Sequence, residues 1–371
     1  MRAKDDFDDI RPYRDAEVPT VLARLMENDA LARSAGAFLA PRMYRWLPGI
    51  TALWVKRTLK RRIAKIKSIH DLQLEVSRFF ERLIETTTAG MTVSGLDKLE
   101  RGCPYLFISN HRDITLDSGF MNYALWSSGF DTSQIAVGDN LFQQHFATDL
   151  MRLNKSFVVR RDIEGPKANL AAMSHTSRYI RHTLEHGESV WIAQREGRAK
   201  DGIDRTEPAI IKMFTLAYRK ELATIEQWLE AVNLVPVSLS YEIDPCAPIK
   251  ARELYLRAHQ GDYEKSDGED LDSILRGIVG YKGRVSVSFG EPIRGQFADA
   301  REVAAACDAE ILRNLTVYPT HTLAFDGSGE LPPKVAEAWA AGLAACEDEH
   351  VEYLRMQYAN QLINRAEIVG A

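Results

Sequence analysis

Apolar positions along the chain follow two different periods, and the change between them divides the sequence. Residues 14–35 and 70–88 place apolar side chains at the spacing of amphipathic helices. From residue 91 onward, short runs rich in β-branched and aromatic residues alternate with helical stretches. The predicted strands lie near residues 91–93, 105–109, 134–137, 157–159, 189–193, 234–240 and 285–289. The predicted helices lie near residues 117–129, 142–153, 166–186, 208–232, 302–315 and 332–367.

This alternation predicts an α/β fold with a mostly parallel sheet flanked by helices. The run 105–108 contains no charged residue, as expected for a strand that is buried on both faces. The acidic stretch 262–272 is predicted to be a solvated loop. We expect a helical N-terminal region over residues 1–87, an α/β domain over 88–298 and a helical C-terminal extension over 299–371.

Charge is distributed unevenly in this chain of 371 residues, whose formal net charge is only −5. Residues 30–70 contain ten Lys and Arg and no Asp or Glu, which leaves 37 of the 47 basic residues against all 52 acidic ones elsewhere. The balance excludes a uniformly basic nucleic-acid binder, and it leaves room for one local cationic patch.

The cysteines argue against a zinc-binding protein, and the apolar runs argue against a membrane-spanning protein. None of Cys103, Cys246, Cys307 and Cys346 stands in a C-x-x-C pair or beside a histidine at metal-ligand spacing, so a zinc knuckle is not expected. We expect free thiols in a reducing compartment. Since no apolar run reaches the roughly 18 to 20 residues of a spanning helix, a soluble or membrane-surface protein is expected.

A histidine stands where the first long predicted strand ends. The chain passes from apolar residues directly into Asn110 and His111, and Asp113 and Asp117 follow within two turns. In open α/β sheets, catalytic groups lie beyond the carboxyl ends of the strands. A carboxylate that accepts a histidine Nδ1–H leaves Nε2 free to take a proton from a hydroxyl. The alternative is an ordinary loop histidine beside a helix-capping aspartate.

Two further predicted strands end in basic clusters. Arginine matches phosphate oxygens bidentately, and glycine lets backbone N–H groups approach an anion. The clusters therefore indicate an anion site, although a single basic pair also fits a solvated surface. Their residues are Arg160 and Arg161 after one strand, and Arg195, Glu196, Gly197, Arg198 and Lys200 after the other.

Together these blocks resemble the glycerolipid acyltransferase superfamily, which contains glycerol-3-phosphate and 1-acylglycerol-3-phosphate acyltransferases. They occur in the family's order over residues 91–293, roughly half of the chain. The matching runs are SNHR at 109–112, FVVRR at 157–161, EGR at 196–198 followed by Lys200, VPV at 235–237 and VSVSFGEPI at 285–293.

The resemblance implies transfer of a fatty acyl group from acyl-CoA or acyl carrier protein to a hydroxyl of glycerol-3-phosphate or a lysophospholipid-like acceptor. His111 would take the hydroxyl proton, with Asp117 favoured as the orienting carboxylate and Asp113 as its rival. No metal or other cofactor is implied. The implied ligands of the acceptor phosphate are Arg160, Arg161, Arg198 and Lys200, within a site shaped by Glu196 and Gly197.

Two features depart from the family pattern. Asp117 follows His111 by six residues instead of five, and on a continuous helix six steps would turn it well away from the histidine. We therefore expect His111 to lie in the turn before the helix. The third block lacks the usual Phe-Pro before Glu196 and is one residue short after Gly197, which leaves open whether Arg198 or Lys200 faces the substrate.

The basic segment over residues 42–67 combines aromatic, apolar and cationic positions. Val55, Leu59, Ile63 and Ile66 fall near one helical stripe, and the aromatic residues Tyr44, Trp46 and Trp54 stand at its start. Such a helix suits the headgroup layer of an anionic membrane. The alternative is a helix that packs its stripe on the α/β core. We expect a peripheral protein at the cytoplasmic face of a membrane, with no nucleic-acid partner.

Three alternatives to acyl transfer by His111 stay open at this stage. The altered His–Asp spacing is compatible with an inactive lipid-binding or regulatory protein on the same fold. Water in place of the acceptor would make the protein an acyl thioester hydrolase. Ser109, the nearby hydroxyl upstream, would have to turn toward His111 to act as a nucleophile.

Overall fold

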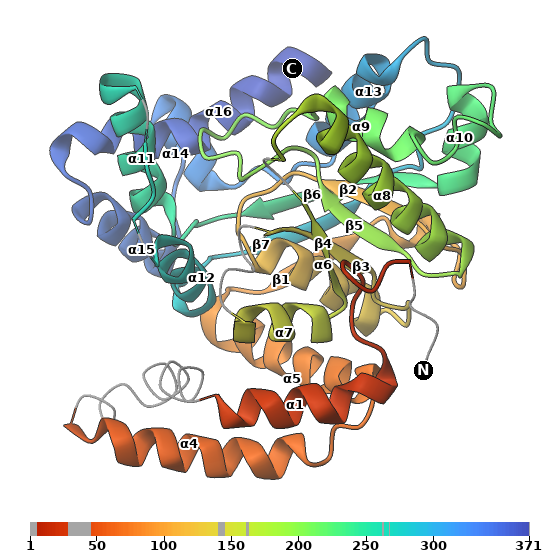
Figure 1. Cartoon of the computed structure of the whole chain (residues 1–371). Coiled ribbons are helices and arrows are strands. Elements are labelled where there is room, and N and C mark those ends of the chain that lie inside the picture. The colour runs from red at the N-terminus through yellow and green to blue at the C-terminus, as the bar shows by residue number, and fades with distance from the viewer. Residues whose placement is uncertain are drawn as a thin grey trace. The chain divides into compact units, whose positions relative to one another are not determined.

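The computed structural model describes residues 6–28, 46–139, 145–160, 163–261, 263–266 and 268–370 (Figure 1). The chain falls into two units that alternate along the sequence. Unit 1 comprises Met1–Phe79 and Gln134–Asn169, and unit 2 comprises Phe80–Ser133 and Leu170–Ala371.

The described residues of unit 1 are mainly helical and include the parallel strands β3 (Gln134–Gly138) and β4 (Ser156–Val159). Its helices include α1 (Val18–Glu27), α4 (Pro48–Ile63) and α7 (His145–Leu153), and the helices α5 (Ile69–Thr87) and α8 (Pro166–Glu185) begin in it. Apolar residues of α1 pack with Ile66 and with Leu153 of α7. An ion pair between Arg24 and Asp149, with N···O 2.6 Å, also joins α1 to α7.

This packing corrects the predicted apolar stripe of the basic segment. Ile66 is buried in the α1 cluster and Ile63 packs against it, so neither faces outward. Tyr44 and the side chains of Val55 and Leu59 lie outside the described residues. The exposed apolar side chains of the basic segment are different ones, and they begin at Trp46, just before α4.

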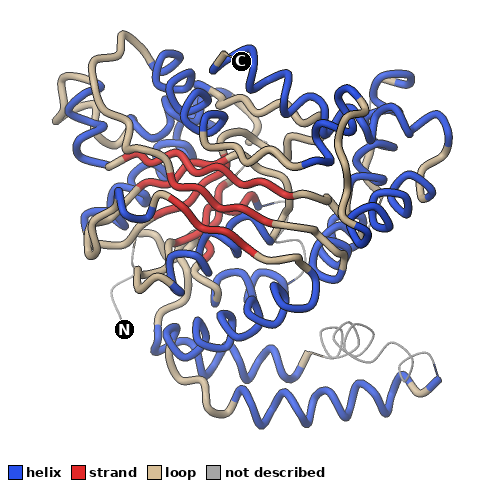
Figure 2. The backbone as a smooth tube through the Cα atoms, turned by 180° about the vertical axis from the view of Figure 1, so that it is seen from behind, coloured by secondary structure: helices blue, strands red, loops and turns tan. Residues whose placement is uncertain are grey.

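The described residues of unit 2 form strands in the order β1-β7-β6-β2-β5. They are β1 (Met91–Ser94), β2 (Leu106–Ser109), β5 (Val190–Ala193), β6 (Leu234–Tyr241) and β7 (Val285–Phe289), drawn in red in Figure 2. All neighbouring pairs are parallel except β6 and β7, which run antiparallel. Every residue of β2, β6 and β7 is buried, which agrees with sequences that contain no charged residue.

Helices surround these strands. α6 packs on β7 and α13 packs on β6, while α16 packs against α11, α13 and α14. The mostly parallel α/β fold flanked by helices is therefore confirmed, as are the helical regions toward both ends of the chain. The helices are α6 (Leu116–Ser127), α9 (Pro208–Thr215), α10 (Ile225–Val232), α11 (Ala247–Gln260), α12 (Glu269–Val279), α13 (Ala300–Arg313), α14 (Pro319–Asp326), α15 (Pro333–Ala344) and α16 (Val351–Val369), with short 3₁₀ turns at Asp15–Glu17, Leu96–Lys98 and Asp348–His350.

The acidic stretch 262–272 is only partly a loop, and there the sequence prediction was wrong. Glu269, Asp270 and Asp272 form the first turn of α12, where carboxylates are stabilised by the N-terminal end of the helix dipole. The helical region predicted at 208–232 is divided into α9 and α10, because Thr224 caps a new helix by accepting the N–H of Gln227.

Within the described residues, none of the helices combines the length and the apolar character needed to span a membrane.

Candidate active site

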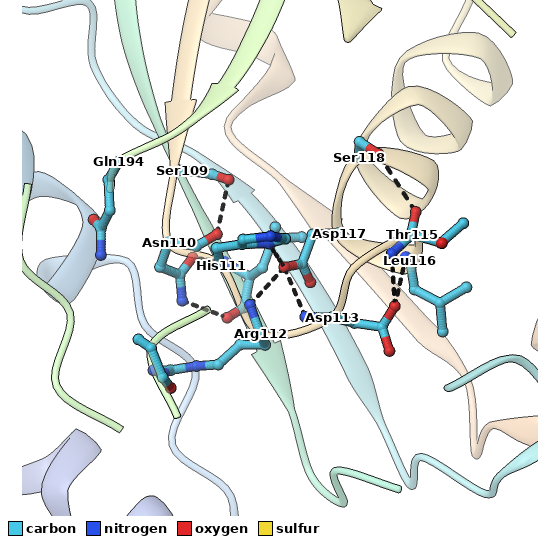
Figure 3. Close-up of polar contacts among 12 residues, drawn as sticks. Ser109, Asn110, His111, Arg112, Asp113, Thr115, Leu116, Asp117, Ser118 and Gln194 are labelled. Atoms are coloured by element: carbon cyan, nitrogen blue, oxygen red, sulfur yellow. Dashed lines mark hydrogen bonds and ion pairs between the residues drawn. The ribbon is translucent and has the colours of Figure 1, made fainter. Parts of the chain in front are cut away.

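The predicted catalytic loop begins at the carboxyl end of β2 and runs to the start of α6. Asn110 is fully buried and anchors this loop to β6: its side-chain oxygen accepts the Leu239 N–H at 2.8 Å, and its amide donates to the Leu239 oxygen at 2.9 Å. Residues 110–113 have no regular secondary structure, so His111 precedes the helix, as its spacing to Asp117 required. Figure 3 shows the loop curving around the carboxylate of Asp117.

His111 and Asp117 are in direct contact. His111 Nδ1 lies 2.7 Å from Asp117 Oδ2, and the aspartate side chain is fully buried, whereas the histidine is 14% exposed (Figure 3). The same Asp117 oxygen accepts the backbone N–H groups of Arg112 at 2.5 Å and Asp113 at 2.9 Å. The other oxygen accepts the hydroxyl of Tyr241 at 2.7 Å. The carboxylate is thus fixed from four directions, with His111 Nδ1 as one of its partners.

These contacts determine the ionisation of Asp117. Burial alone would raise the pKa of its carboxyl group, but the hydrogen bond and charge of His111, together with the Tyr241 hydroxyl, outweigh burial and lower it. Asp117 is therefore a carboxylate at neutral pH. A carboxylate in this position favours the His111 tautomer with hydrogen on Nδ1, which leaves Nε2 unprotonated.

Asp113, the rival carboxylate, has a different position. Its Oδ1 accepts the backbone N–H groups of Thr115 at 2.9 Å and Leu116 at 2.8 Å, so it caps the start of α6. Gly277 of α12 packs so closely that a Cβ there would lie 2.2 Å from Asp113 Oδ2. Burial, followed by the charge of Asp117, raises the pKa of Asp113. The structure thus places Asp117, and not Asp113, against His111.

Replacement of Tyr241 is expected to change the pH dependence of the reaction. Burial and the charge of Asp117 raise the pKa of Tyr241 well above its ordinary value, so its hydroxyl remains a donor to Asp117. Without this donor, Asp117 is more basic and stabilises protonated His111 more strongly. We expect Tyr241→Phe to move the acid limb of the kcat/KM profile up by roughly one pH unit.

The matched control is Tyr218→Phe, which removes the hydroxyl of a buried tyrosine whose ring lies under Arg181. It should retain the wild-type pH profile. An acid limb in Tyr241→Phe that coincides with that of wild type would show that Tyr241 does not tune the pair.

The hydroxyl of Ser109 is engaged elsewhere. Ser109 is fully buried. Its Oγ donates to the backbone carbonyl oxygen of Asn110 at 2.8 Å and accepts Trp191 Nε1–H at 3.0 Å. The Trp191 ring stands edge-on to His111, with centroids 6.0 Å apart. Both partners hold Ser109 in a supporting role beneath the histidine, which argues against a Ser–His nucleophile pair.

A buried charge network supports the loop from below. Arg112 Nη2 pairs with Asp204 Oδ2 at 2.5 Å, and the N–H of Asp204 donates to Asn364 of α16 at 2.8 Å. Lys250 of α11 donates to the Arg112 carbonyl oxygen at 2.6 Å and forms an ion pair with Asp244. Because removing one partner of a buried pair leaves a costly uncompensated charge, this network fixes the backbone on which His111 stands.

The loop after β5 lies beside the histidine, because the Ala199 N–H donates to the His111 carbonyl oxygen at 2.9 Å. Lys200 in this loop pairs with Glu253 of α11, and burial lowers the pKa of Lys200 to about 8. By contrast, the buried atoms Arg195 Nε and Arg198 Nη1 have no hydrogen-bond partner within the described part of the chain. Of the two cations left open by the sequence, Arg198 is thus the one for which the described residues show no carboxylate partner.

The other predicted ligands of the acceptor are placed as follows. Glu196 is exposed, and Gly197 has φ +72°, a left-handed conformation that favours glycine. Arg160 lies in unit 1 directly after β4, where its side chain is half-exposed and pairs with Asp9 at 2.7 Å. Arg161 lies outside the described residues.

Sequence reasoning did not single out Tyr241, Asp204 or Lys250. One signal for Tyr241 was available, since it closes β6, the strand that pairs with the histidine-bearing β2. Asp204 and Lys250 are 92 and 138 residues from Arg112 along the chain, and only the fold brings them together.

Known proteins with similar sequences exist for part of this chain. Residues 90–239 match the family model described as Acyltransferase. The glycerol-3-phosphate acyltransferase of Ectopseudomonas mendocina is 25% identical over 240 residues, which cover 63% of this chain and 27% of that protein. The enzyme of the same name from Pseudomonas syringae pv. tomato is 24% identical over 239 residues, covering 63% and 26%.

The chain therefore spans about a quarter of the length of these curated relatives. Among solved structures, the 1-acyl-sn-glycerophosphate acyltransferase PlsC from Thermotoga maritima aligns with a TM-score of 0.42 and 14% identity, over 77% of this chain and 93% of that one. The match at residues 90–239 and the two curated relatives support the resemblance to the glycerolipid acyltransferase superfamily that the sequence motifs indicate.

Proposed function

We propose that the protein is an O-acyltransferase that moves a fatty acyl group from an acyl thioester to a hydroxyl of a phosphorylated glycerol-type acceptor. The observation that carries the proposal is the contact of 2.7 Å between His111 Nδ1 and the buried carboxylate of Asp117, inside the acyltransferase domain. This contact supports a working acid–base couple despite the unusual spacing of six residues.

The chemistry follows from the unprotonated Nε2 atom. In the proposed reaction, Nε2 takes the proton of the acceptor hydroxyl while the hydroxyl oxygen attacks the thioester carbonyl carbon. The C–S bond then breaks, and the proton passes from His111 to the departing thiolate. Asp117 stabilises the imidazolium between these steps. General acid–base help of this kind accelerates a reaction by about 10²- to 10⁴-fold.

We assign the acceptor phosphate to the loop after β5. Arg198 has a buried guanidinium nitrogen without a partner among the described residues, and Arg195 on the same loop shares this property. A phosphate would supply the missing acceptors, since arginine binds phosphate oxygens bidentately. Lys200 is committed to Glu253, so we place it as a support of this loop. Arg160 and Arg161 belong to unit 1, and this assignment does not include them.

The acceptor is identified by a panel. Purified protein is incubated with a long-chain acyl thioester and either glycerol-3-phosphate, a lysophosphatidate or unphosphorylated glycerol, and acylated products are measured by mass spectrometry. We expect a product with at least one phosphorylated acceptor and none with glycerol. Equal acylation of glycerol would contradict the phosphate site.

We also propose that α4 docks the protein on an anionic membrane. The exposed apolar side chains just before α4 and in its first half include Trp46, which is 82% exposed, and Leu53, which is 68% exposed. The full set is Trp46, Leu47, Ile50, Leu53 and Trp54. At 100° per residue these positions, together with the exposed Arg57 and Lys60, fall within an arc of about 140°. One face of the helix thus offers aromatic and aliphatic groups followed by cations, as interfacial helices do.

We place this docking at the cytoplasmic face of the membrane. Cys103, Cys246, Cys307 and Cys346 are all free, which fits a reducing compartment. We propose that the acyl donor on this cytoplasmic side is an acyl thioester of coenzyme A or acyl carrier protein.

Substitution on the α4 face is expected to weaken membrane binding. Leu53→Glu should reduce binding to vesicles containing anionic phospholipid by about 10-fold or more, since it removes apolar burial and places a negative charge at the surface. Phe325→Glu on α14 is the matched control, because Phe325 is also exposed, at 54%, and should bind like wild type. Binding measured by vesicle flotation should fall at high salt. Equal binding of wild type to neutral and anionic vesicles would refute the docking proposal.

A further inference from the structure

A large cavity lies outside the stretch that the family model matches. It has a volume of about 480 Å³, within the range typical of small-molecule sites. Its walls come from the segment after β6 and from α11, the end of α12, α15 and α16, which lie on one side of unit 2 (Figure 1).

The interior of the cavity is apolar. Its floor includes Ile243, Trp339 and Leu354, which belong to one buried hydrophobic cluster. The α15 side is lined by Ala338, Ala341, Gly342 and Ala345, whose small side chains leave the space between the helices open. An interior of this kind binds hydrocarbon, and it offers few partners to a polar ligand.

The mouth of the cavity is charged. Lys334 Nζ stands 4.2 Å from the centre of the Tyr281 ring, and Arg276 lies nearby on α12. The acids at the cavity are Glu337 and Asp244, and Asp244 is already paired with Lys250. Arg276 pairs with Asp272 at 2.7 Å, so Lys334 is the lining cation that no carboxylate binds among the described residues, and it favours an anionic group beside it.

The cavity wall is also connected to the loop that carries His111. Tyr358 lines the cavity, and its hydroxyl accepts the N–H of Asp244 at 2.9 Å. Asp244 pairs with Lys250, which holds the Arg112 carbonyl oxygen at 2.6 Å. A second, smaller cavity is lined by Arg112 and Lys200 and shares Asp244 and Tyr358 with the large one. A ligand in the large cavity would thus lie beside Asp244, whose partner Lys250 holds the proposed catalytic loop.

We propose that this cavity binds one long hydrocarbon chain of a single-chain lipid, with its anionic head at Lys334. A fatty acid, an acyl thioester and a lysophosphatidate share this chemistry. The proposal concerns binding at the C-terminal helices and does not depend on the acyl transfer proposed above.

The test is direct binding of a fluorescent long-chain fatty acid to the full-length protein. Gly342 is the position to fill, because a Cβ there would meet only Leu354 Cδ1, at 3.9 Å. Gly342→Leu should weaken binding by about 10-fold or more, since every methylene kept out of the cavity costs several-fold in affinity. Ala340→Leu adds the same bulk to the exposed side of α15, outside the cavity lining, and should bind like wild type. Undiminished binding by Gly342→Leu would overturn the site.

Competition against the same probe tests whether an anionic head group is needed and which single-chain lipid binds best. Fatty acid, acyl-CoA and lysophosphatidate compete in separate arms, with a neutral monoacylglycerol of equal chain length as the reference. We expect the anionic lipids to compete more strongly, and Lys334→Glu to abolish that advantage. Equal competition by the neutral lipid would overturn the placement of an anionic head at Lys334. Because binding is measured without turnover, loss of this site is distinguishable from a failure of the proposed acyl transfer.

Discussion

His111→Ala is expected to lower the rate of acyl transfer by about 10²- to 10⁴-fold, the range of general acid–base catalysis. The substitution removes the Nε2 atom that accepts the hydroxyl proton. Asp117 keeps its hydrogen bonds from Tyr241 and from the N–H groups of Arg112 and Asp113. We therefore expect the loop and the thermal unfolding midpoint to change little.

The control for this variant is His186→Ala, which removes an exposed histidine just beyond α8. Both proteins are assayed for transfer and for thermal unfolding. His186→Ala should be as active as wild type. A His111→Ala rate within about tenfold of wild type, in a folded protein, would refute the assignment of His111 as the base.

Asp117→Asn is expected to produce a loss of similar size, about 10²- to 10⁴-fold. An amide cannot stabilise the imidazolium by charge, and its NH₂ group cannot accept the N–H donors that converge on this position. Loss of these bonds also destabilises the fold by about 1 to 3 kcal/mol. Rate and free energy of unfolding are measured on the same preparation.

Asp113→Asn is the matched comparison. Unlike Asp117→Asn, it is not expected to lower the free energy of unfolding. The Asn oxygen can still accept the N–H groups of Thr115 and Leu116, so the cap of α6 survives. The substitution also removes the buried carboxyl group of Asp113, whose pKa is raised by burial and by the charge of Asp117. We expect a rate within about tenfold of wild type and unchanged or higher stability. If Asp113→Asn were the more damaging of the two, the pairing of His111 with Asp117 would be wrong.

The fold class was predictable because each strand carries its own local signal. The uncharged run ending at Ser109 and the alternation after residue 91 predicted a parallel α/β arrangement, and all the predicted strands are present. Helix boundaries were less accessible. Glu269 begins α12 within a stretch whose composition suggests a loop, because the helix dipole stabilises acidic residues that are also typical of loops.

The candidate site was predictable only as a list of residues. The interval of six residues between His111 and Asp117 left two carboxylates open, because their orientation depends on where the loop ends and α6 begins. The partner of Lys200 is Glu253, far along the chain, so the sequence could not separate Lys200 from Arg198. Likewise, Ile63 and Ile66 have the spacing of one helical stripe, and only their packing on α1 shows that Ile66 is buried and Ile63 partly buried.

Acceptor-dependent thiol release is the most direct test of the central claim. Wild-type protein is mixed with an acyl thioester, with and without the phosphorylated acceptor selected by the panel, and free thiol and acylated acceptor are quantified together. The proposed mechanism predicts one thiol released for each acceptor acylated, little release without acceptor, and loss of both in His111→Ala. Equal thiol release without acceptor would identify a thioester hydrolase, and no release under either condition would identify a lipid-binding protein; either result would contradict the proposed acyl transfer.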